Sequence, residues 1–262
     1  MDTNNNFPPG FTLGKFSIYK MQGVDRWIYR AKTGPSKNTI KLGPQYVFLR
    51  QNMSEFGGAA KAASRVISCC YGIKHLADSN FSGPLSRLCK IILKQDSGLS
   101  GQRAVKFSMY GKLIEGFNFN KNAPFESVLK QLPSVQFSPA EARVSVSFPD
   151  IYPLVTLANP WKLAYYRFRI SFGWAPDLEF TERGYAPSNP LLTPGPQQAT
   201  TDWISFPDQI KGFTMDLGLA KDPPVNSGAR MLAVGIEFGK AISDSRIQAV
   251  KYCGSAKILA VG

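Results

Sequence analysis

The feature that most constrains the fold is a series of short alternating segments that fills the chain after residue 98. Pro, Gly and β-forming residues dominate there, and RVSVSF at 143–148 alternates strictly between polar and apolar side chains. Segments of this length, separated by turn residues, indicate antiparallel strands in a β-sandwich of immunoglobulin-like or jelly-roll type. The expected strands are 105–110, 143–148, 165–172, 202–207, 212–217, 231–238, 247–253 and 257–261.

Two helices are predicted before this region, because apolar residues recur at helical spacing over 44–70 and again over 84–94. We expect a kink or break at Gly57-Gly58, since two glycines weaken a helix by about 2 kcal/mol relative to alanine. The small residues from Gly57 onward would let another element approach closely. Ser82 or Gly83 is the expected cap of the second helix, which is expected to bury Leu85, Leu88, Cys89, Ile91 and Ile92.

The first part of the chain predicts a β-hairpin. Phe16 and Ile18 alternate with polar residues in one short run, and Trp27 and Tyr29 share a face in the next. Residues 21–25 form the expected turn between them. A two-stranded ribbon is only marginally stable by itself. This one therefore needs a packing partner: helices of the same chain, a neighbouring subunit or a nucleic acid.

Together these segments predict an α+β fold in three parts. Residues 1–43 form the N-terminal β-hairpin and an extended basic arm, 44–97 a short helical hairpin, and 98–262 the antiparallel β-sandwich. The arm, residues 31–41, carries too little apolar surface to pack alone, so it is a linker or a ligand-contacting segment. With 44% hydrophobic residues, the chain can bury a core.

Charge is segregated along the chain. Residues 1–112 contain 17 Lys and Arg against 5 Asp and Glu, whereas residues 113–262 contain 14 against 13. Nearly all of the net charge of +13 therefore lies in the first part of the sequence. Segregated charge indicates a surface that meets DNA, RNA or another polyanion. The alternative is a solvated face with no specific partner.

A candidate assembly or anion-binding surface combines cations with aromatic rings in the hairpin and arm. Such a mixture neutralises phosphates and stacks on bases. The alternative is that Phe16, Ile18 and Trp27 pack on other elements or on a neighbouring subunit, while lysines keep the sheet edge soluble. The candidate residues are Lys15, Tyr19, Lys20, Arg26, Trp27, Tyr29, Arg30, Lys32, Lys37 and Lys41.

Residues able to form a metal or catalytic site are scarce. The four cysteines have no CxxC spacing and His75 is the one histidine, so the usual zinc patterns cannot be built. We expect the cysteines to be small buried hydrophobes, with a disulfide from Cys69 or Cys70 to Cys89 only if the protein is exported. His75 has no acidic partner in the sequence pattern, so a capping or surface role is expected.

The remaining motifs also argue against an enzyme. Asp177, Glu179 and Glu182 can in principle hold a cation such as calcium, but a solvated strand edge is the preferred expectation. No GxGxxG, Walker A or GxSxG motif occurs. We therefore expect no enzymatic activity, no cofactor and no metal.

The opening of the chain follows a recognisable order. Gly14, Tyr19, Gly23 and Tyr29-Arg30 mark two short strands and their turn, and the basic residues 32–41 with Pro35 are followed by an Ala-rich helix at 56–63 that begins with phenylalanine. This order resembles a group of uncharacterised Bacteroidota proteins. The resemblance implies a C-terminal β-sandwich domain, and it implies no particular activity.

Two functions follow from these features. The first is a non-enzymatic structural protein that self-assembles into a filament, lattice or particle through its N-terminal hairpin and arm, by strand addition to a neighbour. The alternative is a nucleic-acid-binding or packaging protein that uses the basic surface of residues 13–112. A glycan-binding module built on Trp161, Trp174 or Trp203 ranks below both, because such tryptophans usually lie in a sandwich core.

No targeting or spanning segment is visible. The opening residues MDTNNNFPPG are polar, unlike a signal peptide. No apolar run approaches the roughly 20 residues that cross a bilayer. We therefore expect a soluble protein without membrane insertion, either cytoplasmic or part of an assembled particle or filament.

Overall fold

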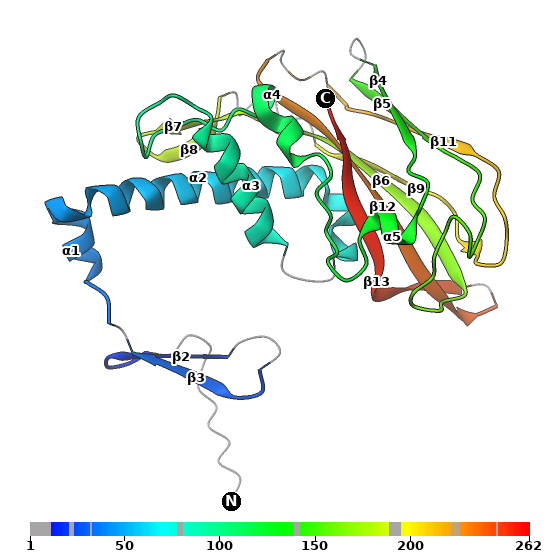
Figure 1. Ribbon diagram of the computed structural model, residues 1–262, viewed down its shortest axis with the longest axis horizontal. Coiled ribbons are helices and arrows are strands. Elements are labelled where there is room, and N and C mark those ends of the chain that lie inside the picture. Colours follow the sequence, from blue (N-terminus) through cyan, green and yellow to red (C-terminus); the bar gives the residue numbers. More distant parts are fainter. Residues whose placement is uncertain are drawn as a thin grey trace, which may run out of the picture. The chain divides into compact units, whose positions relative to one another are not determined.

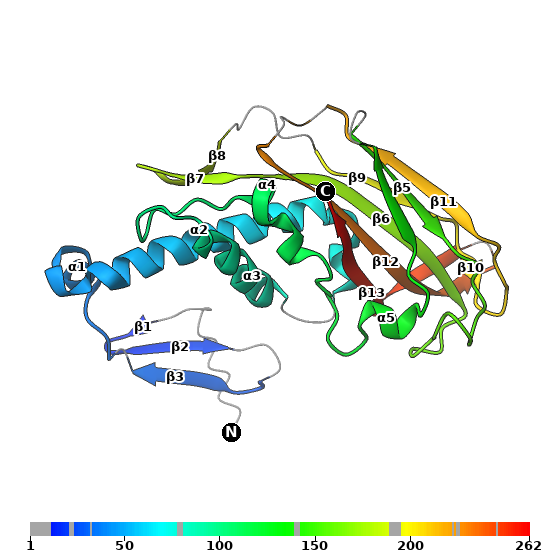
Figure 2. The same cartoon turned by 45° about the horizontal axis from the view of Figure 1, so that its top comes forward.

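A computed structural model describes residues 12–20, 24–31, 33–77, 81–138, 142–188, 195–221, 223, 226–244 and 246–262. The contacts within it divide the chain into two compact units, Met1–Arg50 and Gln51–Gly262. Most of the turn expected at 21–25 lies outside the described residues, as does Lys32. The elements of both units are labelled in Figures 1 and 2.

The first unit contains a small antiparallel sheet. Its strands β1 (Thr12–Leu13), β2 (Phe16–Lys20) and β3 (Trp27–Ala31) lie in that order (Figure 2). The expected hairpin is confirmed, because β2 and β3 pair from Phe16 opposite Ala31 to Lys20 opposite Trp27. Strand β1 was not predicted, since two residues are too few to show a periodicity.

The basic arm is helical over its second half. Residues 37–42 form helix α1 (Lys37–Leu42), and the hydroxyl of its N-cap Ser36 accepts a hydrogen bond from the Thr39 N–H at 3.1 Å. Arg50 Nη1 donates to the carbonyls of Ile40 and Gly43, both at 2.8 Å. Because the cap and Arg50 satisfy groups that a helix end leaves unpaired, the expectation of an extended arm is wrong here.

Helix α2 (Val47–Cys69) follows the 3-10 turn η1 (Pro44–Tyr46) and is unbroken through Gly57 and Gly58. The predicted break at these glycines is therefore wrong. The close approach predicted there is confirmed, because a Cβ on Gly58 would lie 2.6 Å from Cζ of Tyr185. Lys61 also donates to the carbonyl of Tyr185. Packing against this ring offsets the low helix propensity of glycine.

The 3-10 helix η2 (Tyr71–Leu76) leads to the second predicted helix, α3 (Ser82–Lys94), which buries Leu85, Cys89, Ile92 and Leu93. Ile91, expected in the core, is 42% exposed, and Leu88 is only partly buried. The buried set follows the spacing i, i+4, i+7, i+8 of a single helix face. The predicted cap is also wrong: the N-cap is Phe81, which makes no side-chain capping bond.

The second unit has three layers, formed by helices and two antiparallel sheets (Figures 1 and 2). The middle sheet has the order β10-β6-β12-β13, with β9 also pairing with β6, and the outer sheet has the order β11-β5-β4. This arrangement confirms an α+β fold with a β-sandwich. The strands are β4 (Ser134–Ser138), β5 (Arg143–Phe148), β6 (Tyr165–Pro176), β9 (Gln197–Thr200), β10 (Ile204–Ser205), β11 (Phe213–Gly218), β12 (Gly228–Ser243) and β13 (Arg246–Val261).

The middle sheet is buried on both faces. On β12, Val234 and Ile236 belong to the core between the two sheets, whereas Met231 and Ala233 belong to the core beneath the helices. This double burial explains why the strand reads as a nearly continuous apolar run. Strand β5 is covered on one face and alternates, as its sequence predicts.

Several predicted strands differ from those observed. Within 105–110, Val105 makes a single bridge to Leu178, and helix α4 (Phe107–Tyr110) follows. The strands expected at 247–253 and 257–261 form one strand, β13, which bends near Tyr252 with φ 64. The segment 202–207 contains only the two residues of β10.

Short elements complete the second unit. They are η3 (Gly111–Ile114), α5 (Phe125–Val128) and a separate hairpin of β7 (Leu178–Thr181) with β8 (Gly184–Pro187). No helix in the described part of the chain is both long enough and apolar enough to cross a membrane.

All four cysteines are free thiols. Cys69, Cys70 and Cys89 are buried, as predicted, while Cys253 is only partly buried. Burial raises the pKa of the Cys69 and Cys89 thiols to about 12. These two thiols therefore stay protonated and act as apolar packing groups at neutral pH.

The adjacent glycines of α2 provide a matched test of this packing. We expect Gly57→Ala to raise the free energy of unfolding by about 1 kcal/mol, because Gly57 is exposed with no atom near its Cβ position. Gly58→Ala should lower it by about 1–2 kcal/mol, because overpacking against the Tyr185 ring outweighs the gain in propensity. Urea denaturation followed by circular dichroism measures both. Equal effects of the two substitutions would contradict the packing seen at Gly58.

Candidate functional site

The residues predicted from the sequence to form an assembly or anion-binding surface all belong to the first unit. Lys20, Trp27 and Tyr29 lie on one face of its sheet, whereas Tyr19 and Arg30 lie on the other. The structure therefore does not gather the aromatic rings and cations on a single face. Tyr29 is 61% exposed, and Tyr19 and Trp27 are partly buried.

The cations of this unit are available to an external anion. The side chains of Lys15, Lys20, Arg26, Arg30, Lys37 and Lys41 are exposed. Lys20 lies 3.7 Å from Asp25 in a solvent-exposed ion pair, and such pairs contribute little to stability. Within the described residues, the other five cations have no acidic partner.

The first unit buries very little of its own surface. Among the described residues between 14 and 50, Ile18 is the only buried one. Phe16, Leu42 and Phe48 are exposed, and Phe48 reaches 83% exposure. The described part of the first unit therefore leaves several large apolar side chains in contact with solvent.

A second polar cluster, which the sequence did not predict, surrounds Glu237 in the second unit. Along β12, the face that meets the helices presents Ala233, Gly235 and then Glu237. Gly235 lies directly beneath Leu76, the last residue of η2, since a Cβ there would be 2.5 Å from Cδ1 of Leu76. Glu237 is the next residue of β12 on this face, two positions beyond Gly235.

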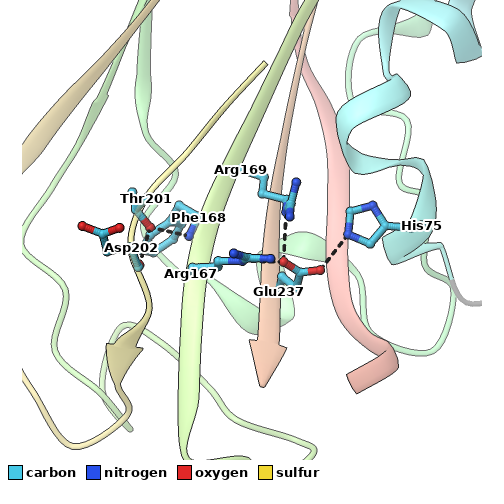
Figure 3. Close-up of polar contacts among 7 residues, drawn as sticks. All are labelled: His75, Arg167, Phe168, Arg169, Thr201, Asp202 and Glu237. Carbon is cyan, nitrogen blue, oxygen red and sulfur yellow. Dashed lines mark hydrogen bonds and ion pairs between the residues drawn. The ribbon is translucent and has the colours of Figure 1, made fainter. Parts of the chain in front are cut away.

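The Glu237 cluster joins two strands to the helical layer (Figure 3). Arg167 Nε and Arg169 Nε donate to Oε2 of Glu237 at 2.6 and 2.9 Å. His75 Nε2 lies 2.7 Å from Oε1. Both arginines come from β6, in which Arg167 is directly opposite Glu237. The guanidinium carbon of Arg167 also lies 4.1 Å from the centre of the Trp203 ring.

Glu237 is ionised at neutral pH in spite of its burial. Its side chain is only 3% exposed. Burial alone would raise the pKa of this carboxyl, but hydrogen bonds from His75, Arg169 and Arg167 outweigh that effect and lower the pKa to about 2. Both carboxylate oxygens are engaged, so Glu237 is held as a fixed anion and is not placed to abstract a proton.

The expectation that His75 lacks an acidic partner is wrong. Its partner Glu237 is 162 positions away in the sequence, so no local pattern could reveal the pair. Two signals were present nevertheless. A single glutamate interrupts the apolar run at 231–238, and Arg167 and Arg169 are spaced for one face of a strand. A buried carboxylate requires cations nearby, and Arg167 and Arg169 were candidates for that role.

The acidic residues 177–182 do not form the predicted solvated edge throughout. Asp177 is buried, and its Oδ1 accepts a hydrogen bond from the Ser108 N–H at 2.9 Å, at the start of α4. Glu179 and Glu182 are exposed. In the described part of the chain, no three His, Cys, Asp or Glu side chains are grouped so that they could hold a metal ion.

The tryptophans proposed for glycan binding are structural in position. Trp174 is buried in the core between the sheets, and Trp161 packs against the same core beside Phe238, with ring centroids 5.1 Å apart. Trp203 covers Arg167. Trp161 and Trp174 thus match the expectation that sandwich tryptophans lie in or against the core, whereas Trp203 belongs to neither core.

Comparison with protein-family models, curated proteins and solved structures finds no match to this chain. The resemblance of the N-terminal pattern to a group of Bacteroidota proteins stays a prediction.

Glu237→Gln tests the electrostatics of the cluster. The depressed pKa stabilises the fold above the ordinary carboxyl pKa near 4.5, and this contribution is lost as the pH falls through about 2. We expect Glu237→Gln to lower the free energy of unfolding at pH 7 by about 3 kcal/mol, because it leaves two arginines without their anion. The substitution should also flatten the decline in stability between those two pH values.

Chemical denaturation at a series of pH values measures both effects. Glu179→Gln is the control, since this carboxylate is exposed at the start of the β7–β8 hairpin. An unchanged pH profile in Glu237→Gln would contradict the ion pairing described here.

Proposed function

We propose that the protein is a non-enzymatic structural protein that self-assembles through its first unit into a filament, lattice or particle. The observation that carries this proposal is the lack of a core in that unit: Ile18 is its only buried residue within the described stretch 14–50. A folded sheet with so little buried surface gains stability when a partner covers it.

The strand edges of the first unit support the same proposal. Within the described residues, β3 pairs only with β2, and β1 covers only Phe16 and Ser17 of β2. Backbone groups are therefore open on both sides of the sheet, and a second copy can add a strand there. The two open edges differ in sequence. A contact between unlike edges is heterologous and continues as a ring or an open filament.

Tyr29→Asp tests assembly directly. Tyr29 is exposed on β3, and tyrosine is enriched among the interface residues whose truncation costs about 2 kcal/mol or more. We expect this substitution to weaken self-association by roughly thirtyfold. Light scattering and negative-stain imaging, at low and high salt and without nucleic acid, provide the measurement. Leu99→Asp, an exposed apolar position in the second unit, is the matched control.

Large regular particles of the wild type and of Leu99→Asp, with smaller species of Tyr29→Asp, would support the proposal. A wild-type protein that stays monomeric at high concentration with an intact sheet would refute it.

A second candidate function is nucleic-acid binding or packaging. It is favoured by the five exposed cations of the first unit that have no acidic partner among the described residues. Lys37 and Lys41 occupy the first and last turns of α1. A glutamate at position 37 interacts favourably with the helix dipole, and a glutamate at position 41 interacts unfavourably. Because these two effects oppose each other, α1 should remain folded.

We expect Lys32→Glu/Lys37→Glu/Lys41→Glu to reduce affinity for DNA or RNA and to lower the slope of log K against log salt by about 3, if each lysine contacts one phosphate. Filter binding over a salt series measures this slope. The control is Lys211→Glu/Lys221→Glu/Lys240→Glu, which makes the same charge change at exposed positions outside residues 13–112. An equal loss of affinity in both triple variants would show that binding depends only on net charge. It would contradict a specific role for the arm.

A further inference from the structure

A groove of about 620 Å³ lies beside the Glu237 cluster in the second unit. Its wall combines cations with an aromatic side chain, and Arg169 and His75 flank Glu237 in it (Figure 3). The volume falls within the range of small-molecule sites, about 300–1,000 Å³, and is larger than a bare inorganic ion requires. The lining residues used below are Tyr71, Lys74, His75, Arg169, Gln198 and Glu237.

The wall of the groove has an excess of positive charge. Among the described residues that line the groove, Glu237 is the one acidic residue, and both of its oxygens already accept hydrogen bonds from Arg167, Arg169 and His75. Lys74 has no acceptor or acidic partner among the described residues. The described lining therefore carries two cations, Arg169 and Lys74, against one carboxylate, before any charge on His75 is counted.

Arg169 is positioned to bind an anion through the rest of its guanidinium group. Its Nε is fixed by Glu237, and its side chain is 20% exposed. A guanidinium group has five N–H donors, and within the described residues those of Arg169 other than the Nε–H have no protein acceptor. Planar N–H groups held in one orientation suit the oxygens of a phosphate.

The other lining residues suit the organic part of a ligand. Tyr71 is 69% exposed, and its side chain makes no hydrogen bond or ring contact among the described residues. Gln198 lies against Gly72, so closely that a Cβ on Gly72 would be 2.6 Å from the amide oxygen. The glycine thus leaves the Gln198 side chain at the wall of the groove, where an amide can donate or accept a hydrogen bond.

We propose that this groove binds a phosphate monoester, with the phosphate held by Arg169 and Lys74 and the organic group placed against Tyr71. The proposal concerns the second unit alone and does not depend on self-assembly. The competing explanation is that the cluster only fastens η2 to the sheet. In that case Lys74, which makes no contact with Glu237, would have no role.

Isothermal titration calorimetry with three probes tests the proposal: AMP, inorganic phosphate and adenosine. We expect AMP to bind, inorganic phosphate to bind more weakly because it lacks the organic group, and adenosine to show no binding because it lacks the charge. Ribose 5-phosphate, a second monoester, should also bind more tightly than inorganic phosphate, because it too has an organic group.

Lys74→Glu should lower the affinity for AMP at least tenfold without loss of fold, since Lys74 is exposed on η2. Lys94→Glu is the matched control, because Lys94 is an exposed lysine on α3 outside the groove, and its affinity should be unchanged. Arg169→Lys keeps the charge but removes the planar group, and should weaken AMP binding while circular dichroism shows a folded protein.

The proposal is overturned if AMP does not bind at millimolar concentration, or if adenosine binds as tightly as AMP. It is also overturned if Lys74→Glu and Lys94→Glu lower the affinity equally. None of these results would bear on self-assembly, which is measured separately on the Tyr29→Asp variant.

Discussion

The pairing of β6 with β12 is the constraint on which the second unit depends. The two strands pair continuously from Pro176 opposite Gly228 to Tyr165 opposite Gly239. Because successive side chains point to opposite faces, this one pair supplies both the core between the sheets and the core beneath the helices. A slip of one residue would exchange the two faces and place the charge of Glu237 between the sheets. Both apolar cores and the buried carboxylate thus specify the same register.

The helix-facing side of this pair changes in character along its length, and the polar groove results from that change. Where Cys69 of α2 comes close to the sheet, the sheet has no side chain: a Cβ on Gly173 would lie 2.7 Å from Cα of Cys69. Gly235 likewise lies close under Leu76, and Glu237, the next residue on this face, contacts His75 of η2. The Glu237 carboxylate is shielded from water, so it binds both arginines strongly. It also lies close enough to the surface that Arg169 still lines the groove. Burying an ion pair is weak evidence of stabilisation by itself, but here it orients a cation.

The parts of the fold that could be predicted from the sequence are those with a local signature. The strand 143–148 alternates because one of its faces is buried, and its bounds match β5. The hairpin was also predicted from an alternation of apolar and polar residues, although only Ile18 of its described residues is buried. The short strands β7, β8 and β9 could not be predicted, because four residues are too few to show a clear alternation. Strand β9 is also held by β6, which is distant in the sequence. Helix α4 depends on Asp177, nearly seventy positions away.

The same limit applies to the candidate sites, and it shows where a sequence argument about charge fails. The excess of cations over residues 1–112 suggested one oriented surface, yet the boundary between the compact units falls at Arg50. Arg65, Arg87 and Lys94 therefore belong to the second unit, with its complete cores and its own groove. The cations of the first unit form a smaller set, divided between two faces of a sheet and a short helix. A polyanion that contacts this unit alone meets few charges. Its binding would then be modest and steeply weakened by salt, whereas contacts between open strand edges and exposed aromatic rings would persist at high salt. Salt dependence is consequently the property that separates the two functions proposed for the first unit.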